Sequence, residues 1–358
     1  MKKVLLIGST PPPMGGIAKW VQRMLNSNLQ NGWTLDLVND GIVGKRESFG
    51  DDIKYNIKDE IKRWAGVWYN LLKKARKNDV YVVHACPIAS LPSLMANLVS
   101  AIVVKICGKK LLIHFRCTVP NMVKTRFQTL ILKGLCALSD KIICLNSQTV
   151  SYLGAKTKTP TILIPNFVDV KEYAHQISRS SGNIKTVLYV GGVISEKGCD
   201  NLVEVAKKLP NIQFRLVGLP SSEITDKASK VENVVMTGVK SGDDLQAEYS
   251  QADVFLFLSR FLGEGFSNAV VEAMASGLPC VVTNWAANAD QIENEKGGFV
   301  VGTDVVNDTV DALNKLSSQD IRKEMGDYNA MKVRNEYSAK YVLSKYVECY
   351  EELKNGKF

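Results

Sequence analysis

The sequence lacks the residue spacings that mark several common classes of protein. Its eight cysteines are scattered without any Cys-x-x-Cys pair, and most of them lie in apolar stretches. This pattern favours buried free thiols over disulfides or metal ligands. The glycine-containing segment 10–18, which follows the first apolar run, contains no Gly-x-Gly-x-x-Gly motif, which argues against a dinucleotide-dependent oxidoreductase. No recognised nucleic-acid-binding motif accompanies the basic residues, so nucleic acid is not an expected partner.

The sequence also lacks a secretory signal and a clear membrane span. The apolar run at residues 4–8 is too short for a signal-peptide core and is better explained as a first β-strand, so we expect a cytoplasmic chain that starts at Met1. No charged residue occurs between positions 87 and 104, and these eighteen residues reach the lower length of a membrane-spanning helix. Two prolines, three serines and an asparagine dilute the segment, which favours a buried helix of an α/β domain.

Short apolar runs alternate with longer helical patterns along the 358 residues, as is typical of parallel sheets with helical crossovers. Strands are predicted in the first half at 3–7, 33–38, 79–84, 110–115, 141–145 and 161–164. The pattern restarts in the second half at 185–189, 213–217, 234–237, 253–258 and 280–283. The chain is long enough for two domains of ordinary size. We therefore predict an α/β protein with two doubly wound domains, joined near residues 166–184.

Positive charge is concentrated in the first half of the chain. Residues 1–175 contain 25 basic and 11 acidic side chains, a net charge of +14, and the remaining 20 basic and 25 acidic side chains give −5. Residues 54–77 combine eight of these lysines and arginines with aromatic and leucine residues at roughly helical spacing. A helix of this kind could rest on anionic lipid headgroups. The alternative is a solvated charged face over an ordinary core stripe.

The most informative segment contains two glutamates, Glu264 and Glu272, separated by eight positions. A short apolar strand at 253–258 precedes a glycine-containing loop, and a helical pattern follows the loop. Glu264 thus lies at the C-terminal edge of a buried strand, just ahead of a helix N-terminus whose amides favour anions and sugar hydroxyls. Gly263 and Gly265 would let backbone amides approach a ligand. The simpler alternative is that Glu264 caps the helix and Glu272 is solvated.

Other candidate residues also follow predicted strands. Gly15 and Gly16 follow the first strand and open a helix, where a diphosphate could contact the exposed amides, although an isolated pair of glycines is also a plain turn. His114, Asn166 and Lys197 follow strands as well. Because ligands of open α/β sheets bind outside the carboxyl ends of the strands, we expect these residues to converge on one cleft between the domains.

The segment 264–282 resembles the E-x7-E signature of retaining, nucleotide-sugar-dependent glycosyltransferases with the GT-B fold, in particular glycosyltransferase family 4. Three further segments agree with that family in order along nearly the whole chain. They are the first glycine-rich loop at 10–18, the interdomain Pro-Asn segment at 163–169 and the phosphate-binding turn at 190–198.

The resemblance implies two Rossmann-like, doubly wound domains that face each other across a cleft. Residues 1–168 would bind the acceptor and residues 169–335 the nucleotide-sugar. Residues 336–358 would form a C-terminal helix that packs back on the first domain, and the apolar and aromatic residues of 338–352 have the spacing of an amphipathic helix.

The resemblance also assigns roles to single residues. Lys197, Glu264 and His114 are implied as catalytic residues: Lys197 would neutralise the departing nucleoside diphosphate, and His114 would lie beside the donor sugar. The alternative for His114 is a satisfied core histidine. The implied donor-binding residues are Gly15, Gly16, Asn166, Gly191, Arg260, Gly265, Phe266, Ser267 and Glu272.

One position departs from the family pattern. The family usually has an arginine after the first glycine of the phosphate-binding turn, and this chain has Gly192 there. Arg260 or Arg116 could supply the missing cation. The departure keeps a second hypothesis open, a catalytically weak or inactive GT-B binding protein.

The implied activity is that of a retaining hexosyltransferase without a cofactor. The donor would be a UDP-sugar, with a GDP-sugar as the alternative, and the acceptor a lipid-linked or membrane-proximal glycan in polysaccharide assembly. The enzyme would work in the cytoplasm or peripherally at the inner face of the plasma membrane. No Asp-x-Asp triad follows a predicted strand in a suitable context, so no metal is expected. A nucleotide-sugar 2-epimerase of similar fold is the remaining alternative.

Overall fold

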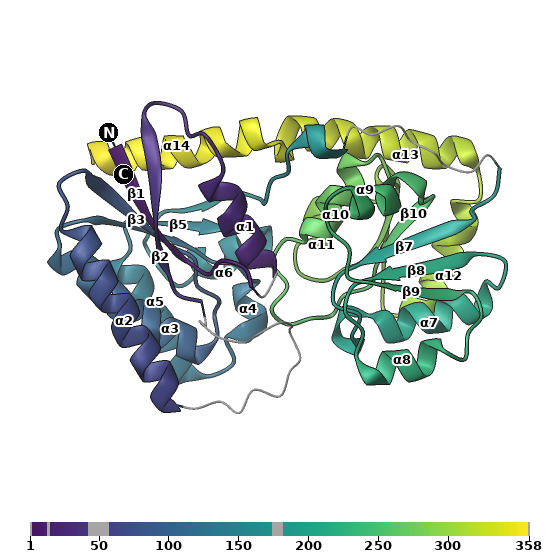
Figure 1. Cartoon of the computed structure of the whole chain (residues 1–358), viewed down its shortest axis with the longest axis horizontal. Helices are drawn as coiled ribbons and strands as arrows, with labels where there is room; N and C mark the ends of the chain where they lie inside the picture. The colour runs from purple at the N-terminus through teal and green to yellow at the C-terminus, as the bar shows by residue number, and fades with distance from the viewer. Residues whose placement is uncertain (1, 13–14, 42–56, 174–181, 357–358) are drawn as a thin grey trace. The chain divides into compact units, whose positions relative to one another are not determined.

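The computed structural model describes residues 2–12, 15–41, 57–173 and 182–356 (Figure 1). The chain divides into two compact units. Unit 1 comprises Met1–Pro165 and Val342–Phe358, and unit 2 comprises Asn166–Tyr341. The implied roles of the domains, acceptor binding in the first and donor binding in the second, stay predictions.

Unit 1 is built on a parallel sheet of six strands in the order β2-β1-β3-β4-β5-β6. The strands are β1 (Lys2–Gly8), β2 (Trp33–Asn39), β3 (Val80–Ala85), β4 (Lys110–His114), β5 (Lys141–Cys144) and β6 (Thr161–Leu163). The helices are α1 (Gly16–Leu25), α2 (Ile57–Ala75), α3 (Leu91–Ile106), α4 (Val119–Met122), α5 (Arg126–Leu138), α6 (Ser147–Gly154) and α14 (Ala339–Asn355), the last of which begins in unit 2.

Alternate residues of the central strands pack against different helices, because successive side chains of a strand point to opposite faces. On one face Leu5, Val83 and Ile113 belong to the core that also contains the buried sides of α2, α3 and α5. On the other face His84 and His114 contact aromatic side chains of α1 and α14. Both faces of the sheet are therefore covered, as the apolar runs predicted.

Helix α3 corrects one expectation. The charge-free segment does form a helix that packs on the sheet, but only one side of it is buried. Several large apolar side chains on its other side are exposed to solvent. Within the described residues, no helix is long and apolar enough to cross a membrane.

Unit 2 repeats the architecture with a parallel sheet in the order β12-β11-β10-β7-β8-β9. Its strands are β7 (Thr186–Val190), β8 (Gln213–Val217), β9 (Val234–Gly238), β10 (Val254–Phe257), β11 (Cys280–Thr283) and β12 (Gly298–Val301). Its helices are α7 (Cys199–Lys208), α8 (Ser222–Ala228), α9 (Gly242–Gln251), α10 (Asn268–Ala275), α11 (Asn288–Gln291), α12 (Val305–Lys315) and α13 (Gln319–Lys332). The strand β12 was not predicted from the sequence.

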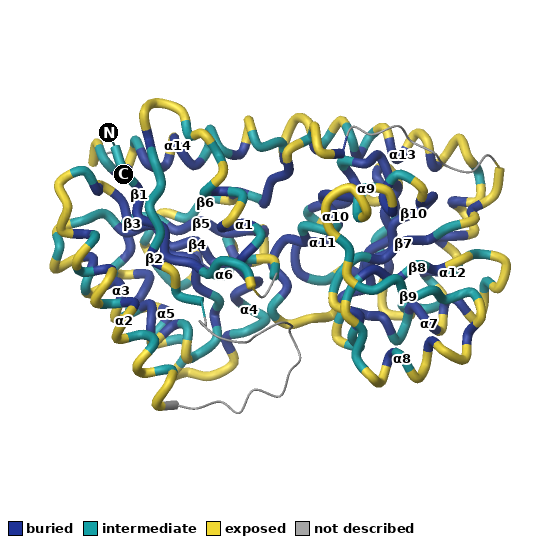
Figure 2. Tube along the Cα trace, viewed as in Figure 1, coloured by how far each residue is buried: buried dark blue, intermediate teal, exposed yellow. Residues whose placement is uncertain are grey.

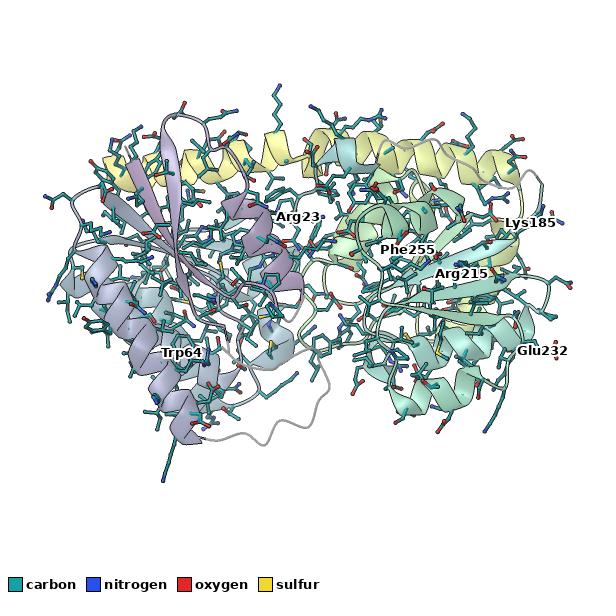
Figure 3. All side chains as sticks on the ribbon, viewed as in Figure 1. Arg23, Trp64, Lys185, Arg215, Glu232 and Phe255 are labelled. Atoms are coloured by element: carbon teal, nitrogen blue, oxygen red, sulfur yellow. The ribbon has the colours of Figure 1, made fainter. Side chains whose placement is uncertain are left out.

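The interior of unit 2 is rich in aromatic side chains. Tyr189 on β7 stacks on Phe257 of the neighbouring strand β10 with 6.1 Å between ring centroids, and Phe257 stacks on Phe255 of the same strand at 6.3 Å. Phe255 is labelled among the side chains of this unit in Figure 3. Figure 2 shows the dark, buried trace of β7 and β10 at the centre of this unit. The eight cysteines all lie in described residues as free thiols, and all but the half-buried Cys107 are buried, in agreement with the prediction of buried free thiols.

Candidate functional site

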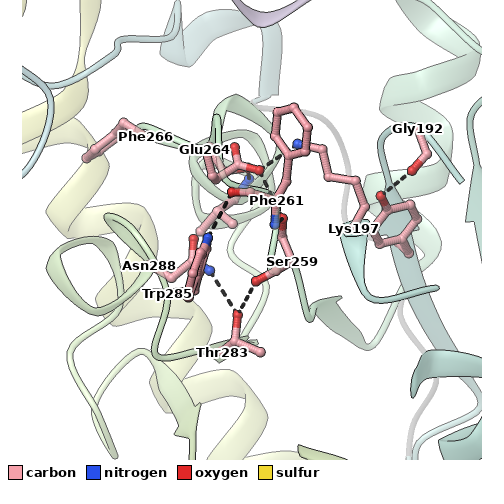
Figure 4. Close-up of polar contacts among 12 residues, drawn as sticks. Gly192, Lys197, Ser259, Phe261, Glu264, Phe266, Thr283, Trp285 and Asn288 are labelled. Carbon is pink, nitrogen blue, oxygen red and sulfur yellow. Dashed lines mark hydrogen bonds and ion pairs between the residues drawn. The ribbon is translucent and has the colours of Figure 1, made fainter. Parts of the chain in front are cut away.

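The loop between β10 and α10 brings two predicted site residues into direct contact. Lys197 Nζ lies 2.5 Å from Glu264 Oε2, and Ser259 Oγ donates a hydrogen bond to the same oxygen at 3.0 Å (Figure 4). The Lys197 ammonium also lies 4.7 Å from the centre of the Phe261 ring. The sequence placed Lys197 and Glu264 at one site, and the structure shows that they form an ion pair.

A glycine turn allows Lys197 to reach this loop. Gly198 adopts a left-handed conformation with φ of +79°, and a Cβ atom there would lie 2.0 Å from the carbonyl oxygen of Leu258. Only glycine permits such a close approach of two backbones without strain. The amide of Arg260 donates to the carbonyl of Glu196 at 2.9 Å, which joins the same two segments.

The phosphate-binding turn predicted at 190–198 is held from inside the unit. The Tyr189 hydroxyl donates to the Gly192 carbonyl at 2.7 Å, and burial raises the pKa of this phenol well above its usual value. Gly192 itself is exposed, and a Cβ atom at this position would meet nothing within 4 Å. The turn can therefore accept a side chain here.

The two candidate replacements for the missing cation lie in different units. Arg260 is exposed and forms a two-pronged ion pair with Asp200, whose carboxylate oxygens lie 2.9 and 3.0 Å from the Arg260 Nη2 atom. Arg260 thus lies beside the turn that carries Gly192. Arg116 belongs to unit 1, where its guanidinium packs over the Trp20 ring at 4.4 Å.

Glu272 lies in the middle of α10 and is only 1% exposed. The Tyr249 hydroxyl donates to its Oε2 atom at 3.2 Å. The N-cap of α10 is Ser267, whose Oγ accepts from the Val270 amide. The simpler explanation from the sequence, in which Glu264 caps the helix and Glu272 is solvated, is therefore wrong for both residues.

The loop between β10 and α10, which we call the donor loop after its predicted role, is held by hydrogen bonds from other segments of unit 2. Asn166 Nδ2 donates to the Phe266 carbonyl at 2.7 Å, and the Ala287 amide donates to the Gly265 carbonyl at 3.2 Å. Gln291 both accepts from the Ser267 amide and donates to its carbonyl. Four of the predicted donor-binding residues, Asn166, Gly265, Phe266 and Ser267, are thus part of one hydrogen-bonded loop.

Sequence reasoning missed a layer of residues beneath this loop. Thr283 Oγ1 donates to the Ser259 carbonyl at 2.7 Å, and Trp285 Nε1 donates to the Phe261 carbonyl at 2.8 Å (Figure 4). Thr283 ends β11, the strand next to β10. The rule that ligand sites gather at the carboxyl ends of adjacent strands could have identified it.

In unit 1 the first glycine-rich loop leads directly into α1. Gly15 is the N-cap of this ten-residue helix, and its carbonyl accepts from the Lys19 amide at 2.8 Å. Gly16 is exposed. Residues 13 and 14 of the same predicted loop lie outside the described residues. The prediction that this helix start binds a diphosphate stays a prediction.

His114 is fully buried in a chain of hydrogen bonds within unit 1. Arg116 Nη1 lies 3.0 Å from His114 Nε2, His114 Nδ1 lies 3.2 Å from His84 Nε2, and His84 Nδ1 lies 2.8 Å from the Tyr350 hydroxyl. Because Arg116 can only donate, His114 must donate to His84, and His84 to Tyr350. This is the geometry of a satisfied core histidine, and a role beside the donor sugar stays a prediction.

The same cluster contains a group of atoms that could be mistaken for a metal site. One ligand atom each of His84, Cys86 and His114 lies within 4.8 Å of the others. Burial raises the pKa of the Cys86 thiol to about 12 and lowers that of His84 to about 3. The Arg116 guanidinium occupies one His114 nitrogen. A cation beside a guanidinium and a protonated thiol would be unfavourable, so the cluster is better explained as a hydrogen-bonded core.

A pocket of about 370 Å³ opens at the carboxyl ends of β1, β2 and β3 in unit 1. Burial raises the pKa of Asp40 to about 6, although the Arg63 charge opposes this shift. Arg63 also forms an ion pair with Glu60 at 2.5 Å. The lining residues are Ser9, Ile17, Asp40, Glu60, Arg63, Trp64, Cys86, Ile88, Ser90, Pro92 and Ser93.

Comparison with known proteins identifies the family. Residues 184–319, most of unit 2, match the family model described as glycosyl transferases group 1. Residues 184–319 thus form a group 1 glycosyltransferase domain. The solved structure of a sucrose-phosphate synthase from Thermosynechococcus elongatus superposes over the full length of both chains with a TM-score of 0.79 and 17% identity. The chain therefore has the GT-B fold, as predicted from the motifs.

Two curated relatives extend the similarity beyond the matched domain. An uncharacterized glycosyltransferase of Methanocaldococcus jannaschii is 25% identical over 65% of this chain and 64% of its own length. The UDP-Gal:alpha-D-GlcNAc-diphosphoundecaprenol alpha-1,3-galactosyltransferase of Escherichia coli is 24% identical over 80% of this chain and 78% of its own length. The archaeal alignment thus covers less than two thirds of that relative.

Proposed function

We propose that this protein transfers a hexose from a nucleotide-sugar, with retention of configuration and without a metal, to a lipid-linked or membrane-proximal glycan. The ion pair of Lys197 and Glu264 at the end of β10 is the observation that carries this proposal. It joins a cation and a carboxylate at the loop edge of a Rossmann-like sheet, where nucleotides bind in this architecture.

Lys197 is the candidate for neutralising the leaving group. Negative charge builds up on the nucleoside diphosphate as the glycosidic bond breaks, so a positioned ammonium stabilises the transition state more than the ground state. Glu264 holds the ammonium in place before the donor arrives. Once the donor is bound, Glu264 together with the amides of Gly265 and Phe266 would bind the sugar hydroxyls.

Glu272 is the candidate ligand of the donor ribose. Its burial and its hydrogen bond from Tyr249 support a fixed carboxylate that accepts hydrogen bonds from a ligand rather than a mobile surface charge. Ser267 and Asn166 would act by holding the loop around the donor.

The acceptor would bind to unit 1. Its 370 Å³ pocket has the size of a small-ligand site and combines carboxylates, an arginine and serines with the Trp64 indole, a set of groups suited to sugar hydroxyls and ring faces. A UDP-sugar is the favoured donor and a lipid-diphosphate glycan the favoured acceptor, because the Escherichia coli relative is named for both. A GDP-sugar is the alternative donor. The work would take place in the cytoplasm or at the inner face of the plasma membrane.

A binding protein without turnover is the second candidate. It is motivated by Gly192, where the family arginine is absent. Binding of a nucleotide-sugar without hydrolysis or transfer would support this candidate over the enzyme.

A donor screen tests the proposal. UDP-, GDP- and ADP-sugars are first compared for binding and then for transfer to lipid-diphosphate acceptors, and the anomeric configuration of the product is read by NMR. The same assay with a chelator tests metal independence. Lys227→Ala is the matched control for Lys197→Ala, because Lys227 also pairs with a glutamate in unit 2 but lies on the exposed helix α8. If Lys197→Ala transfers sugar as fast as the active control Lys227→Ala, Lys197 does not stabilise the leaving group.

A further inference from the structure

The outer face of α3 is apolar along the whole helix. Met95, Val99, Ile102 and Ile106 recur every three or four residues and therefore form one stripe. Their exposed fractions are 48, 37, 46 and 71%. Single exposed apolar residues are ordinary on soluble proteins, but a continuous apolar stripe marks an interaction surface.

Helices α2 and α5 pack beside α3 (Figure 1), and they also carry exposed apolar side chains. On the α2 side, Trp68 Nε1 lies within hydrogen-bond distance of the Ala96 carbonyl and the Ser100 hydroxyl, which fixes the two helices together. On the α5 side, a Cβ atom at Gly134 would be in ordinary van der Waals contact with Leu98, at 3.6 Å. We call the exposed apolar residues of the three helices the apolar ridge: Ile61, Tyr69, Met95, Val99, Ile102, Ile106, Phe127 and Leu130.

Cations lie on the same helices as the ridge. Helices α3 and α5 contain no acidic residue, and the exposed lysines of α2 outnumber its one exposed acidic residue, Asp59. The exposed basic side chains of α2 and α5 are Lys58, Lys62, Lys73, Arg126 and Lys133, and the exposed Arg76 directly follows α2. The yellow, exposed segments of these helices are visible on α2, α3 and α5 in Figure 2.

We propose that the apolar ridge inserts among the headgroups of an anionic lipid membrane while the flanking cations bind the lipid phosphates. Apolar side chains surrounded by lysine and arginine are the composition of membrane-surface helices. A second copy of the chain is a poorer occupant, because a symmetric contact would bring the two sets of cations together. The proposal relocates the membrane contact predicted for residues 54–77: α2 supplies charge, and α3 with α5 supplies most of the inserted surface.

The inference deepens the proposed function, because an enzyme held in this way would meet a lipid-linked acceptor at the membrane surface. Vesicle binding is nevertheless independent of catalysis. Vesicle binding without any sugar transfer would contradict only the proposed function. Sugar transfer to a soluble acceptor without vesicle binding would contradict only the proposal that the apolar ridge binds membranes.

Vesicle sedimentation tests the ridge. The full chain is mixed with vesicles of phosphatidylcholine alone or with phosphatidylglycerol added, and we expect binding to the anionic vesicles that weakens as salt is raised. Replacement of the α3 stripe should lower the partition coefficient roughly ten-fold or more, because four apolar side chains no longer enter the membrane. This stripe variant carries Met95→Ser, Val99→Ser, Ile102→Ser and Ile106→Ser.

A matched control carries the same number of serines on unit 2. Its positions are also exposed and apolar, and we expect it to bind like the unchanged chain: Leu219→Ser, Val239→Ser, Ile321→Ser and Met331→Ser. A third variant should lose the salt-sensitive part of binding; it carries Lys58→Ser, Lys62→Ser, Lys73→Ser and Arg76→Ser. Thermal unfolding shows whether each variant is folded, and a folded stripe variant is required for the comparison.

Three results would overturn the proposal. The first is an unchanged chain that does not bind anionic vesicles, and the second is a folded stripe variant that binds as well as the control. The third is a dimer in solution that the stripe variant converts to a monomer, since the ridge would then be an interface between copies. If the serine variant does not fold, the uncharged double variant Ile102→Gln with Ile106→Gln, at the two positions nearest the end of α3, replaces it in the same comparison.

Discussion

Tyr249 donates a hydrogen bond to the buried carboxylate of Glu272, with 3.2 Å between the two oxygen atoms. A carboxylate that is 1% exposed is stable only while its oxygens have hydrogen-bond donors. The tyrosine on α9 thus holds in place a residue that we assign to donor binding on α10.

This contact separates a positioning role from a binding role. We expect Tyr249→Phe to weaken donor affinity several-fold with little change in the transfer rate at saturation, because the carboxylate remains. Glu272→Gln should abolish most transfer, and Glu272→Ala should in addition lower the free energy of unfolding by about 1–3 kcal/mol through lost buried hydrogen bonds. Donor titration and denaturant unfolding measure the two effects. A Tyr249→Phe variant with unchanged donor affinity would show that the hydroxyl serves only the fold.

Loss of the Lys197 ammonium should slow transfer strongly and change the free energy of unfolding little. Lys197→Ala removes one charge-assisted contact to the leaving group. The loss should raise the activation free energy of transfer by about 2–3 kcal/mol, which lowers kcat/KM roughly 30- to 150-fold. Stability should change little, because Glu264 keeps its hydrogen bond from Ser259. Steady-state kinetics beside the Lys227→Ala control provide the measurement. Transfer near the unchanged level would remove Lys197 from the mechanism.

An arginine restored at position 192 should raise activity. The position is open, since a Cβ atom there meets nothing within 4 Å, and the Tyr189 hydrogen bond uses only the Gly192 carbonyl. Gly192→Arg would add a cation beside the turn that carries Lys197, and we expect kcat/KM to rise roughly ten-fold. Gly192→Gln is the uncharged control.

The same substitution tests whether Arg260 compensates. If it does, Arg260→Ala should lose activity in the unchanged chain and much less in the Gly192→Arg background. If Gly192→Arg does not raise kcat/KM and Arg260→Ala does not lower it, this site works without a second cation.

The buried histidines should make unit 1 sensitive to acid. Burial, and to a smaller extent the Arg116 charge, lowers the pKa of His84 from 6.5 to about 3. His84 therefore binds a proton near pH 6.5 in the unfolded chain but only near pH 3 in the folded chain. Above pH 6.5 this difference does not affect the free energy of unfolding, and between pH 6.5 and 3 it lowers that free energy by up to about 1.4 kcal/mol for each pH unit.

Unfolding in denaturant at a series of pH values checks this expectation. His84→Gln keeps a polar side chain beside Tyr350 but cannot titrate. Between pH 6.5 and 3, the slope of its free energy of unfolding against pH should therefore be smaller, by an amount that corresponds to up to one bound proton. The same slope for both proteins would show that His84 takes up its proton in the folded state.

The strands and the donor loop could be predicted because their signals are local. Apolar runs bounded by polar residues predict β7 and β10 wherever they occur, and the glycines beside Glu264 mark a loop. By contrast, β12 begins with glycine and only two of its four residues are buried, whereas all four residues of β10 are buried, so the apolar pattern of β12 is weaker. The exposed face of α3 could not be predicted, because an absence of charge indicates burial as readily as contact with lipid.

Contacts between residues that are far apart in the chain could not be predicted from the sequence. Nothing near Glu272 indicates that Tyr249 on another helix will contact it, and nothing near Arg260 indicates Asp200. The ion pair of Lys197 with Glu264 joins positions 67 residues apart. Such contacts depend on how helices cross the sheet, which a single sequence without co-varying partners does not reveal.

The return of α14 to unit 1 has a consequence for synthesis on the ribosome. Tyr350 accepts the hydrogen bond of His84, and Tyr346 packs against Trp20 and both buried histidines. Domains usually fold in the order in which they emerge. Here the first sheet leaves the ribosome long before the helix that covers its histidine face, while all of unit 2 is made in between. The nascent first sheet therefore lacks the contacts of its buried histidines with Tyr346 and Tyr350 until α14, which follows unit 2 in the chain, has been synthesised.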